Sequence, residues 1–501
     1  MHRFTPGLRL PSVVIIVWLI STFTLVAAPN AGDSTVTATS EKRFQPSKAQ
    51  PFAPSNASVE GGRKLVPEDF EDPAVCAGCH PVQYQGWKGS MHSNSFNDPI
   101  FQAEWALAEK ELGPEISKFC GGCHAPAGML TDTIKFDPEA GEHGAFTAPD
   151  IARNGVFCDV CHTISGNNLL ATSVLEHGNG SYVSSPGRIK RGPLKDAQSP
   201  YHETEYSEHH TKSDFCGNCH NIFNPLNNFP IERTYDEWKY SVYAQQGVQC
   251  QDCHMVPVET AMRVADEMKP VARLENHQLG GFAGMGADKE RDVVHGHGFV
   301  GGNAVVTAML NDDAADGGHA AIARERLENV AELELFLKRV SGPLHELKVK
   351  VTNRRAGHDL PTSLTHIREL WLDVTILDDK GNTLLRSGAL DAHQEIDPDA
   401  VMFKSYAVDK AGKPAEFIWH IERFENRTTI PPKGHRYGQY AFNVPDTSPT
   451  VTVIAKLNYR SFSQHFADHL LGKGKLKVPT IEMERMERRF ETGKLRVTQR
   501  E

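Results

Sequence analysis

The C-terminal part of the chain alternates apolar and polar residues, the pattern of β-strands with one buried face. Three segments show it most clearly: LHELKVKVTN from Leu344, ELWLDVTILD from Glu369 and TVIAKLNYRS from Thr452. The sequence DKGN at 379–382 is typical of a hairpin turn. Short strands separated by Gly, Pro and Asn clusters predict a β-sandwich over residues 341–480.

Residues 301–340 instead carry apolar side chains at three- and four-residue spacing, the period of an amphipathic helix. The pattern predicts two helices, Ala304–Leu310 and Ile322–Val340, separated by an Asp/Gly-rich turn. We expect them to form a helical connector in front of the sandwich. Residues 481–501 form a charged tail, whose stretch rich in Met, Arg and Glu predicts a further helix ending near Arg489.

Residues 67–300 follow neither period for long, and Gly and Pro are frequent between their apolar clusters, as at Gly113-Pro114 and Gly192-Pro193. This composition favours loops and short helices. The expected fold class is therefore α+β and multidomain. It combines a mostly loop and short-helix N-terminal domain, a helical connector and a C-terminal β-sandwich.

Residues 1–28 are typical of a signal peptide, because a basic segment with Arg3 and Arg9 leads into an apolar run that ends in small residues. The run is also long enough for a membrane anchor. Cleavage after Ala28 is the favoured interpretation, and retention as an anchor is the alternative. Residues 29–66 are rich in Ser, Thr, Ala, Pro and Lys and predict a flexible linker.

Between residues 67 and 300, Cys-x-x-Cys is followed at once by His five times. In covalent c-type haem attachment, the two thiols add to the haem vinyl groups and the adjacent imidazole becomes the proximal iron ligand. The predicted thioether cysteines are Cys76, Cys79, Cys120, Cys123, Cys158, Cys161, Cys216, Cys219, Cys250 and Cys253. The predicted proximal ligands are His80, His124, His162, His220 and His254.

Zinc knuckles, disulfides and thioredoxin-like sites also use Cys-x-x-Cys. Zinc and disulfide chemistry do not require His directly after the second Cys, and chance would rarely place it there five times in a chain with 24 His among 501 residues. The motifs use all ten cysteines, so no thiol remains for a disulfide or a free nucleophile. We therefore expect five covalently bound haem c groups, whose porphyrins supply the apolar surface that residues 67–300 lack.

The formal net charge is −10, and removing residues 1–28 with their two arginines makes it −12. This charge argues against nucleic acid and anionic membrane surfaces as partners. It leaves other redox proteins, terminal acceptors such as minerals or metal ions, and self-assembly. Because bacteria attach haem to this motif outside the cytoplasmic membrane, we expect an exported protein, periplasmic or at the cell surface or extracellular. Membrane contact is expected only if the N-terminal segment is retained.

The sixth iron ligand decides between electron transfer and catalysis. A second His occupies the last coordination position of the iron, whereas its absence leaves that position open to a substrate. Nine His outside the motifs lie between residues 67 and 300, enough to give each of five irons a second His ligand. The candidate distal ligands are His92, His202, His210, His297 and, as the alternative to His297, His295. His358, in the turn GHDLPTS, is expected to stabilise that turn or to close the haem interface.

Full bis-His ligation favours an exported electron carrier with closely packed haems. Such a carrier can be a soluble shuttle, a subunit of a redox complex or a protomer of a filament, with the β-domain as a docking module or a structural cap. The alternative is a multihaem oxidoreductase with one open haem site that acts on a small nitrogen or sulfur species. All five motifs end in His, whereas one nitrite-reducing group has Lys at this position of one motif. No catalytic residue is predicted.

The run WKGSMHSNSFNDPIF resembles the Trp…Ser-x-His segment of multihaem cytochromes related to the nitrifier tetrahaem cytochrome that accepts electrons from hydroxylamine oxidoreductase. GVFCDVCH, GVQCQDCHM and HHTKSDFCGNCHN are similar to segments of exported multihaem cytochromes, a group that includes extracellular filament subunits. NRRAGHDLPTS followed by ELWLDVTILDDKGN resembles the β-domain of many of them. The resemblance implies closely stacked haem pairs, His92 as a distal ligand and electron transport between partners. The presence of five motifs departs from the tetrahaem members.

Overall fold

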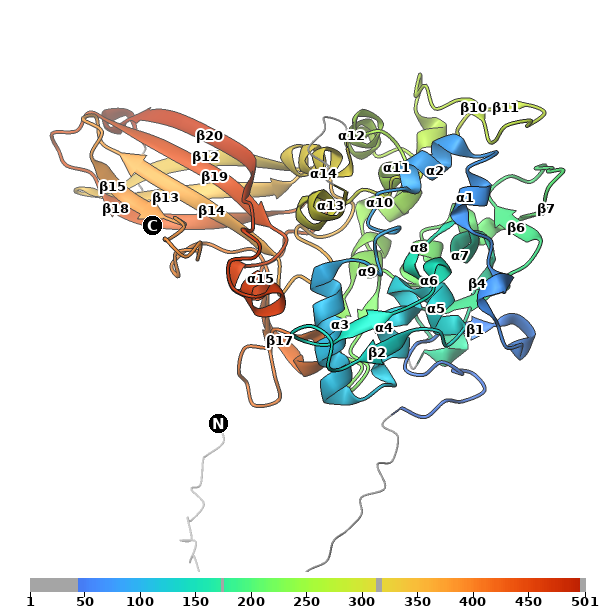
Figure 1. The fold of residues 1–501 in the computed structure, drawn as a ribbon. Helices are drawn as coiled ribbons and strands as arrows, with labels where there is room; N and C mark the ends of the chain where they lie inside the picture. The colour runs from blue at the N-terminus through green and yellow to red at the C-terminus, as the bar shows by residue number, and fades with distance from the viewer. Residues whose placement is uncertain (1–43, 173–174, 312–317, 496–501) are drawn as a thin grey trace, which may run out of the picture. The chain divides into compact units, whose positions relative to one another are not determined.

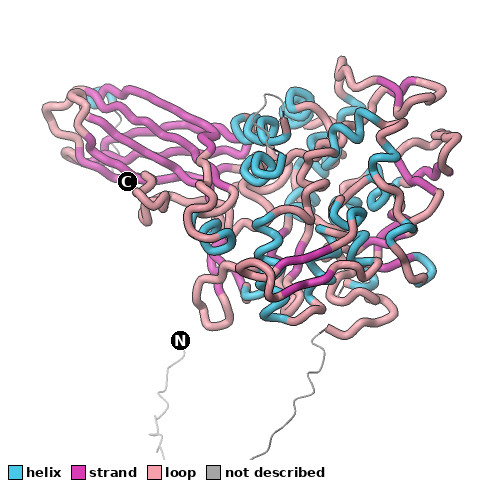
Figure 2. The backbone as a smooth tube through the Cα atoms, in the orientation of Figure 1, coloured by secondary structure: helices cyan, strands magenta, loops and turns pink. Residues whose placement is uncertain are grey.

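In the computed structural model, the described residues are 44–172, 175–311 and 318–495. Helices and loops dominate the half that carries the cysteine motifs, and long strands dominate the C-terminal half (Figure 1, Figure 2). The predicted α+β, multidomain fold class is confirmed. Within the described ranges, no helix has both the length and the apolar character to cross a bilayer. The predicted signal peptide lies outside these ranges.

Residues 44–300, here called the motif region, consist of short helices joined by loops. The helix α3 (Pro99–Leu112) begins where the side chain of Asp98 accepts hydrogen bonds from the N–H groups of Ile100 and Phe101, and it ends at Gly113, whose φ is 90°. The other helices are α1 (Pro73–Cys76), α2 (Pro81–Trp87), α4 (Ile116–His124), α5 (Pro126–Leu130), α6 (Asp150–Arg153), α7 (Cys158–His162), α8 (Asp214–Gly217), α9 (Thr234–Lys239), α10 (Val242–Gln245), α11 (Cys250–His254) and α12 (Val258–Glu267).

Small two- and three-stranded sheets hold the loops of the motif region together. Their strands are β1 (Ser58–Val59), β2 (Lys135–Asp137), β3 (Ala145–Thr147), β4 (Ile164–Asn167), β5 (Tyr182–Ser184), β6 (Ile189–Gly192), β7 (Glu203–Tyr206), β8 (Ile222–Phe223), β9 (Pro230–Glu232), β10 (Gly281–Phe282) and β11 (Glu290–Arg291). None of these sheets is large enough to form a core by itself, so they serve as braces between loops.

Residues 44–66 differ from the predicted flexible linker. Phe44 and Leu65 are buried, and β1 pairs in parallel with β5. The side chain of Asn56 donates a hydrogen bond of 3.0 Å to the carbonyl of Gly178. The composition of the segment predicted disorder because it has few apolar residues, but its polar groups and its strand edge find partners in loops far along the chain.

The predicted connector contains two helices, α13 (Ala304–Asn311) and α14 (His319–Glu328). The prediction of a helix up to residue 340 is wrong, because β12 (Ala331–Ser341) is a strand. Its buried residues alternate with more exposed ones, so the period is two. Pairing with β13 (Leu344–Asn353) along almost the whole strand outweighs the helix propensity of its Leu, Glu and Lys residues.

Two antiparallel sheets form the β-sandwich, with strand orders β12-β13-β18 and β15-β14-β19-β20. The remaining strands are β14 (Glu369–Leu377), β15 (Thr383–Ser387), β18 (His435–Asn443), β19 (Thr450–Arg460) and β20 (Ile481–Glu491), with a separate hairpin of β16 (Ser405–Val408) and β17 (Arg423–Arg427). The predicted turn joins β14 to β15, and the φ of 85° at Gly381 suits glycine.

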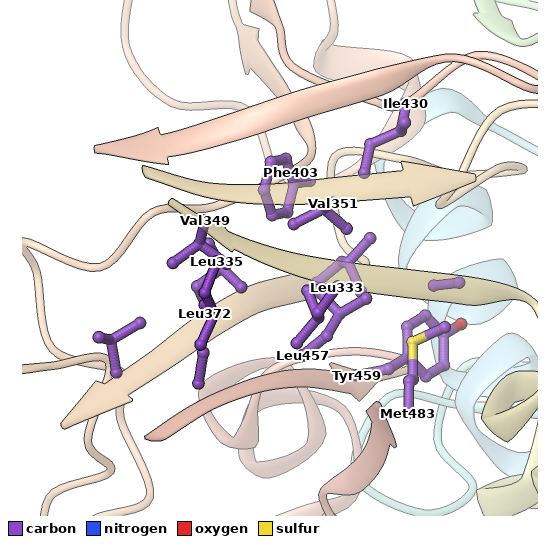
Figure 3. Packing of buried hydrophobic residues seen from close by; sticks show 14 of the residues in the cluster. Leu333, Leu335, Val349, Val351, Leu372, Phe403, Ile430, Leu457, Tyr459 and Met483 are labelled. Carbon is purple, nitrogen blue, oxygen red and sulfur yellow. The ribbon is translucent and has the colours of Figure 1, made fainter. Parts of the chain in front are cut away.

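Apolar side chains from both sheets meet between them and form the core of the sandwich (Figure 3). Leu333 and Val349 come from one sheet and Leu372 and Leu457 from the other, and all four are almost completely buried. This packing follows directly from the alternation in the sequence, since every second residue of each strand faces the opposite sheet.

The tail after residue 480 is a strand and not the predicted helix. β20 pairs with β19 along its length, with Ile481 and Met483 buried and Glu482 between them exposed. Its Glu, Arg and Met residues favour helices in isolation, but the unpaired edge of β19 offers a full ladder of hydrogen bonds. The β-sandwich therefore covers residues 331–491 and not the predicted 341–480.

The motif region and the β-sandwich share one hydrophobic cluster. Ile100 and Phe119 belong to the same cluster as Phe462 and Phe466, the latter on α15 (Gln464–Leu471). The sandwich therefore contributes to the packing beside the second cysteine motif.

Leu457→Ala should lower the free energy of unfolding by about 2–5 kcal/mol, because it leaves a cavity between the two sheets. Guanidinium unfolding of the haem-loaded protein, followed by far-UV circular dichroism, measures this change. Leu170 is 81% exposed, so Leu170→Ala is the matched control and should change the free energy by less than about 0.5 kcal/mol. Equal effects of the two substitutions would contradict the described core.

Candidate haem sites

The cysteine motifs lie in or at the ends of short helical turns. The third and fifth motifs are α7 and α11, and the second forms the C-terminal end of α4. Residues three apart in a helix lie on one face, so both thiols of such a motif can reach one porphyrin edge. All ten cysteines are free thiols and line one continuous cavity of about 1330 Å³.

A backbone carbonyl from another segment orients four of the five motif histidines. The distances from Nδ1 to the carbonyl oxygen are 2.9 Å for His80 and Ala283, 3.3 Å for His124 and Ser95, 2.6 Å for His162 and Arg191, and 2.9 Å for His254 and Val300. An Nδ1–H group that donates to a carbonyl leaves Nε2 free for iron, as in metal-binding histidines generally. The residues at these four motifs therefore fit a haem.

His220, in the fourth motif, has a carboxylate partner instead. Its Nδ1 lies 3.9 Å from Oε1 of Glu232, a buried residue on β9. Burial by itself would lower the pKa of His220, but the nearby carboxylate of Glu232 raises that pKa to about 9. A carboxylate behind a ligating His makes the imidazole a stronger donor to the metal. The fourth motif therefore also fits a haem, and it differs from the other four in having a carboxylate beside its histidine.

Burial keeps several of the other imidazoles neutral. It lowers the pKa of His254 to about 3 and that of His124 to about 4. It also lowers the pKa values of His92 and His297 to about 3. The neutral imidazole is the form that binds a metal, so these side chains need not lose a proton to bind iron at neutral pH.

A second histidine ring faces four of the five motif histidines. Two imidazoles bound to one iron, each at about 2 Å, place their ring centres about 6 Å apart. The distances between ring centres are 6.5 Å for His80 and His202, 6.1 Å for His220 and His92, 6.3 Å for His162 and His297, and 6.2 Å for His254 and His358. These four pairs therefore have the spacing that bis-His ligation requires.

His162 has a second ring neighbour, His210, with 5.8 Å between the ring centres. Nε2 of His210 lies 3.1 Å from the carbonyl oxygen of Cys161, whereas His297 uses Nδ1 for the carbonyl of His295 and keeps Nε2 free. His297 therefore has the more ligand-like orientation. Within the described part of the chain, His295 faces no other histidine ring, and its buried Nδ1 has no hydrogen-bond partner.

His124, in the second motif, has a different environment. No histidine ring of the described residues faces it, and the ring of Phe101 stacks on its imidazole with 3.6 Å between ring centres and 9° between planes. Among the described residues, an iron held by His124 therefore has no histidine as its second axial ligand.

Three ionisable side chains line the cavity near the second motif: Asp98, Glu104 and Arg368. Burial, together with the charge of Asp98, raises the pKa of Glu104 to about 8 against the opposing charge of Arg368. Burial also raises the pKa of Asp98 to about 6. The guanidinium of Arg368 donates a hydrogen bond of 2.7 Å to the carbonyl of Ser461. Glu104 is therefore mostly protonated at neutral pH and can donate a proton into this part of the cavity.

Thiols of different motifs lie within hydrogen-bonding reach of one another. These pairs are Cys76 with Cys158, Cys123 with Cys219, and Cys216 with Cys250. The first motif therefore lies beside the third, and the fourth lies beside both the second and the fifth. This spatial order differs from the order of the motifs along the chain.

Three residues of these sites were not predicted as functional. His358 was expected to stabilise the turn GHDLPTS or to close the haem interface, and not to bind iron. Phe101 and Glu104 are three residues apart on α3, so they share a helix face. Nothing in the sequence indicated that this face lies near the second motif.

Comparison with known proteins gives a family match over part of the chain and a match in fold. The family described as "Cytochrome c554 and c-prime" matches residues 75–163, which contain the first three motifs. A search of curated proteins found no significant match. The crystal structure of a penta-heme cytochrome c552 from Thermochromatium tepidum aligns with a TM-score of 0.57 and 20% identity over 84% of this chain and 99% of that chain.

A structural-genomics structure, target SoR45, aligns with 11% identity over 34% of this chain and 95% of its own, but at a TM-score of only 0.16. The identity of 20% to the penta-heme cytochrome establishes a shared fold only. The attachment motifs and the oriented imidazoles add the chemistry that the fold alone does not give. The motifs, the family match and the shared fold together support a multihaem c-type cytochrome that binds haem c covalently.

Proposed function

We propose that this chain is an exported pentahaem c-type cytochrome that carries electrons between redox partners. The single cavity lined by all five motifs is the main support. Haem c, when bound, takes up and releases one electron at its iron. Because thioether bonds fix each haem edge at its two cysteines, neighbouring thiols would hold neighbouring haem edges close together.

The thiol contacts support a path that departs from chain order. They connect the first motif to the third, and the fourth to the second and the fifth. Cys161 and Cys219 also lie close enough for their thiols to influence each other, which places the fourth motif near the third. The proposed path runs through the first, third, fourth and fifth motifs, and the second is a side branch from the fourth.

We propose that the protein works outside the cytoplasm, in the periplasm or at the cell surface. The apolar segment at residues 1–28 and the attachment chemistry of the motifs support this location. The net charge of −10 supports partners with basic docking surfaces, or metal-ion and mineral acceptors. We also propose that several copies can assemble, so that electrons pass from one copy to the next.

The EPR spectrum of the oxidised, haem-loaded protein tests the proposed ligation. We expect four low-spin ferric centres and one high-spin centre, because only His124 lacks a facing histidine within the described residues. The mass of the intact protein should correspond to five attached haems.

Replacing both cysteines and the histidine of the second motif should abolish the high-spin signal. The same replacement at the first motif is the matched control, and it should remove a low-spin centre instead. Five low-spin centres in the unmodified protein, or a high-spin signal that survives loss of the second motif, would refute the assignment.

An oxidoreductase with its open haem at the second motif is the second candidate function. The environment of His124 favours it, because an open position there would be accompanied by the proton donor Glu104 and the cation Arg368. This combination suits a small anionic or polar nitrogen or sulfur species that must be bound and protonated.

The pH dependence of nitrite binding tests this candidate. Glu104 has a raised pKa of about 8, so it is protonated below that pH and charged above it. The nitrite-induced change in the high-spin signal should therefore be large at lower pH and decline above about pH 8. Glu104→Gln should flatten the profile, whereas the exposed Glu139→Gln should leave it unchanged. If neither nitrite nor hydroxylamine alters the signal at any pH, the oxidoreductase candidate fails.

A further inference from the structure

We infer that the β-sandwich supplies the sixth ligand of the iron at the fifth motif, through His358. The inference rests on the proposed haem at Cys250 and Cys253. His358 lies outside the motif region, in the loop between β13 and β14. One iron would then be bound by two separate parts of the chain, and docking of the sandwich would become part of the haem site.

The geometry of the two rings fits a shared iron. The ring centres of His254 and His358 are 6.2 Å apart, and the planes differ by 19°. Nδ1 of His254 donates to the carbonyl of Val300 and Nδ1 of His358 donates to that of Asp359, at 2.9 and 3.0 Å. Both Nε2 atoms therefore remain available, and both residues line the haem cavity.

The sandwich holds the backbone of His358 in place. The side chain of Asn353, at the end of β13, is fully buried and donates to the carbonyls of His358 and Ile430, at 2.8 and 3.1 Å. Leu360 forms a β-bridge with Ile430 on the other side of His358. The loop is therefore fixed on both sides of the histidine, which is what a well-defined ligand requires.

A buried charged cluster joins this loop to the motif region. Glu237 on α9 accepts hydrogen bonds from the backbone N–H of Asp359 at 3.1 Å and from the hydroxyl of Thr362 at 2.6 Å. Arg427 of β17 pairs with Glu237 and, at 3.1 Å, with Asp359. The side chains of Glu237 and Asp359 are only 6% and 14% exposed. Both carboxylates therefore have a cationic partner, as buried charges require, and the cluster positions the loop next to the fifth motif.

The other histidine near the fifth motif is less suited to this role. The next residue, Gly296, donates its N–H to the carbonyl of Met255, directly after the proximal His254, at 2.8 Å. This bond holds the backbone of His295 beside that of the fifth motif. Among the described residues, His358 is the histidine whose ring faces His254.

His358→Ala in the full, haem-loaded chain tests the inference. We expect the EPR spectrum to gain one high-spin centre and to lose one low-spin centre, because the iron at the fifth motif loses its sixth ligand. Added imidazole should restore the low-spin centre. His345→Ala is the matched control, because His345 is also a buried histidine of the sandwich but hydrogen-bonds with Pro343, and it should leave all centres unchanged.

If His358→Ala does not fold, His358→Met provides the second test. Methionine either binds the iron, which raises one of the reduction potentials, or fails to reach it, which gives one additional high-spin centre; both results support the inference. Unchanged spin states and potentials in a folded variant would overturn it, with His295 as the remaining ligand.

Mass analysis of the peptide that contains Cys250 and Cys253 separates this inference from the proposed function. A peptide without haem would refute the proposed fifth haem. A peptide with haem, combined with an unchanged spectrum of the variants, would refute only the role of His358.

Discussion

The hydrogen bond from the Nδ1–H group of a motif histidine to a distant carbonyl is the constraint on which the haem sites depend. The His80 bond reaches Ala283, 203 residues further along the chain. The His254 bond reaches Val300, in the segment that leads to α13. Each bond fixes the plane of an imidazole and anchors a loop that has little other structure. The same hydrogen bonds therefore orient the motif histidines and hold the loops in place in the motif region.

The two halves of the molecule reach stability by different means. The sandwich has a continuous core in which residues such as Leu372 and Leu457 are completely buried between two sheets. The motif region has several smaller clusters arranged around a cavity lined by the cysteines. Its side chains enclose an apolar cavity, and a group that fills such a cavity contributes packing energy. The proposed haems would therefore act as the missing core of this half.

Much of the fold followed from local patterns, because alternation within β13, β14 and β19 directly encodes one buried face. β12 and β20 were predicted as helices, since Leu, Glu, Arg and Met favour helices until a neighbouring strand offers a pairing edge. Attachment residues could be predicted because thioether chemistry requires contiguous residues. The rings that face the motif histidines could not be predicted in the same way. Contacts such as His254–His358 and His124–Phe101 depend on how distant segments pack and not on local sequence.

The position of the fourth motif links the two candidate functions. Its thiols contact those of the second and fifth motifs, so an electron there has two neighbouring sites besides the third motif. Glu232 lies beside His220, and a carboxylate behind a ligating His would lower the reduction potential of an iron bound there. A haem of low reduction potential at the fourth motif would pass its electron readily to an oxidised haem at a neighbouring motif. In the proposed function, the chain would conduct towards the fifth site at the β-sandwich or supply the second site, and the relative potentials of those two sites would decide between them.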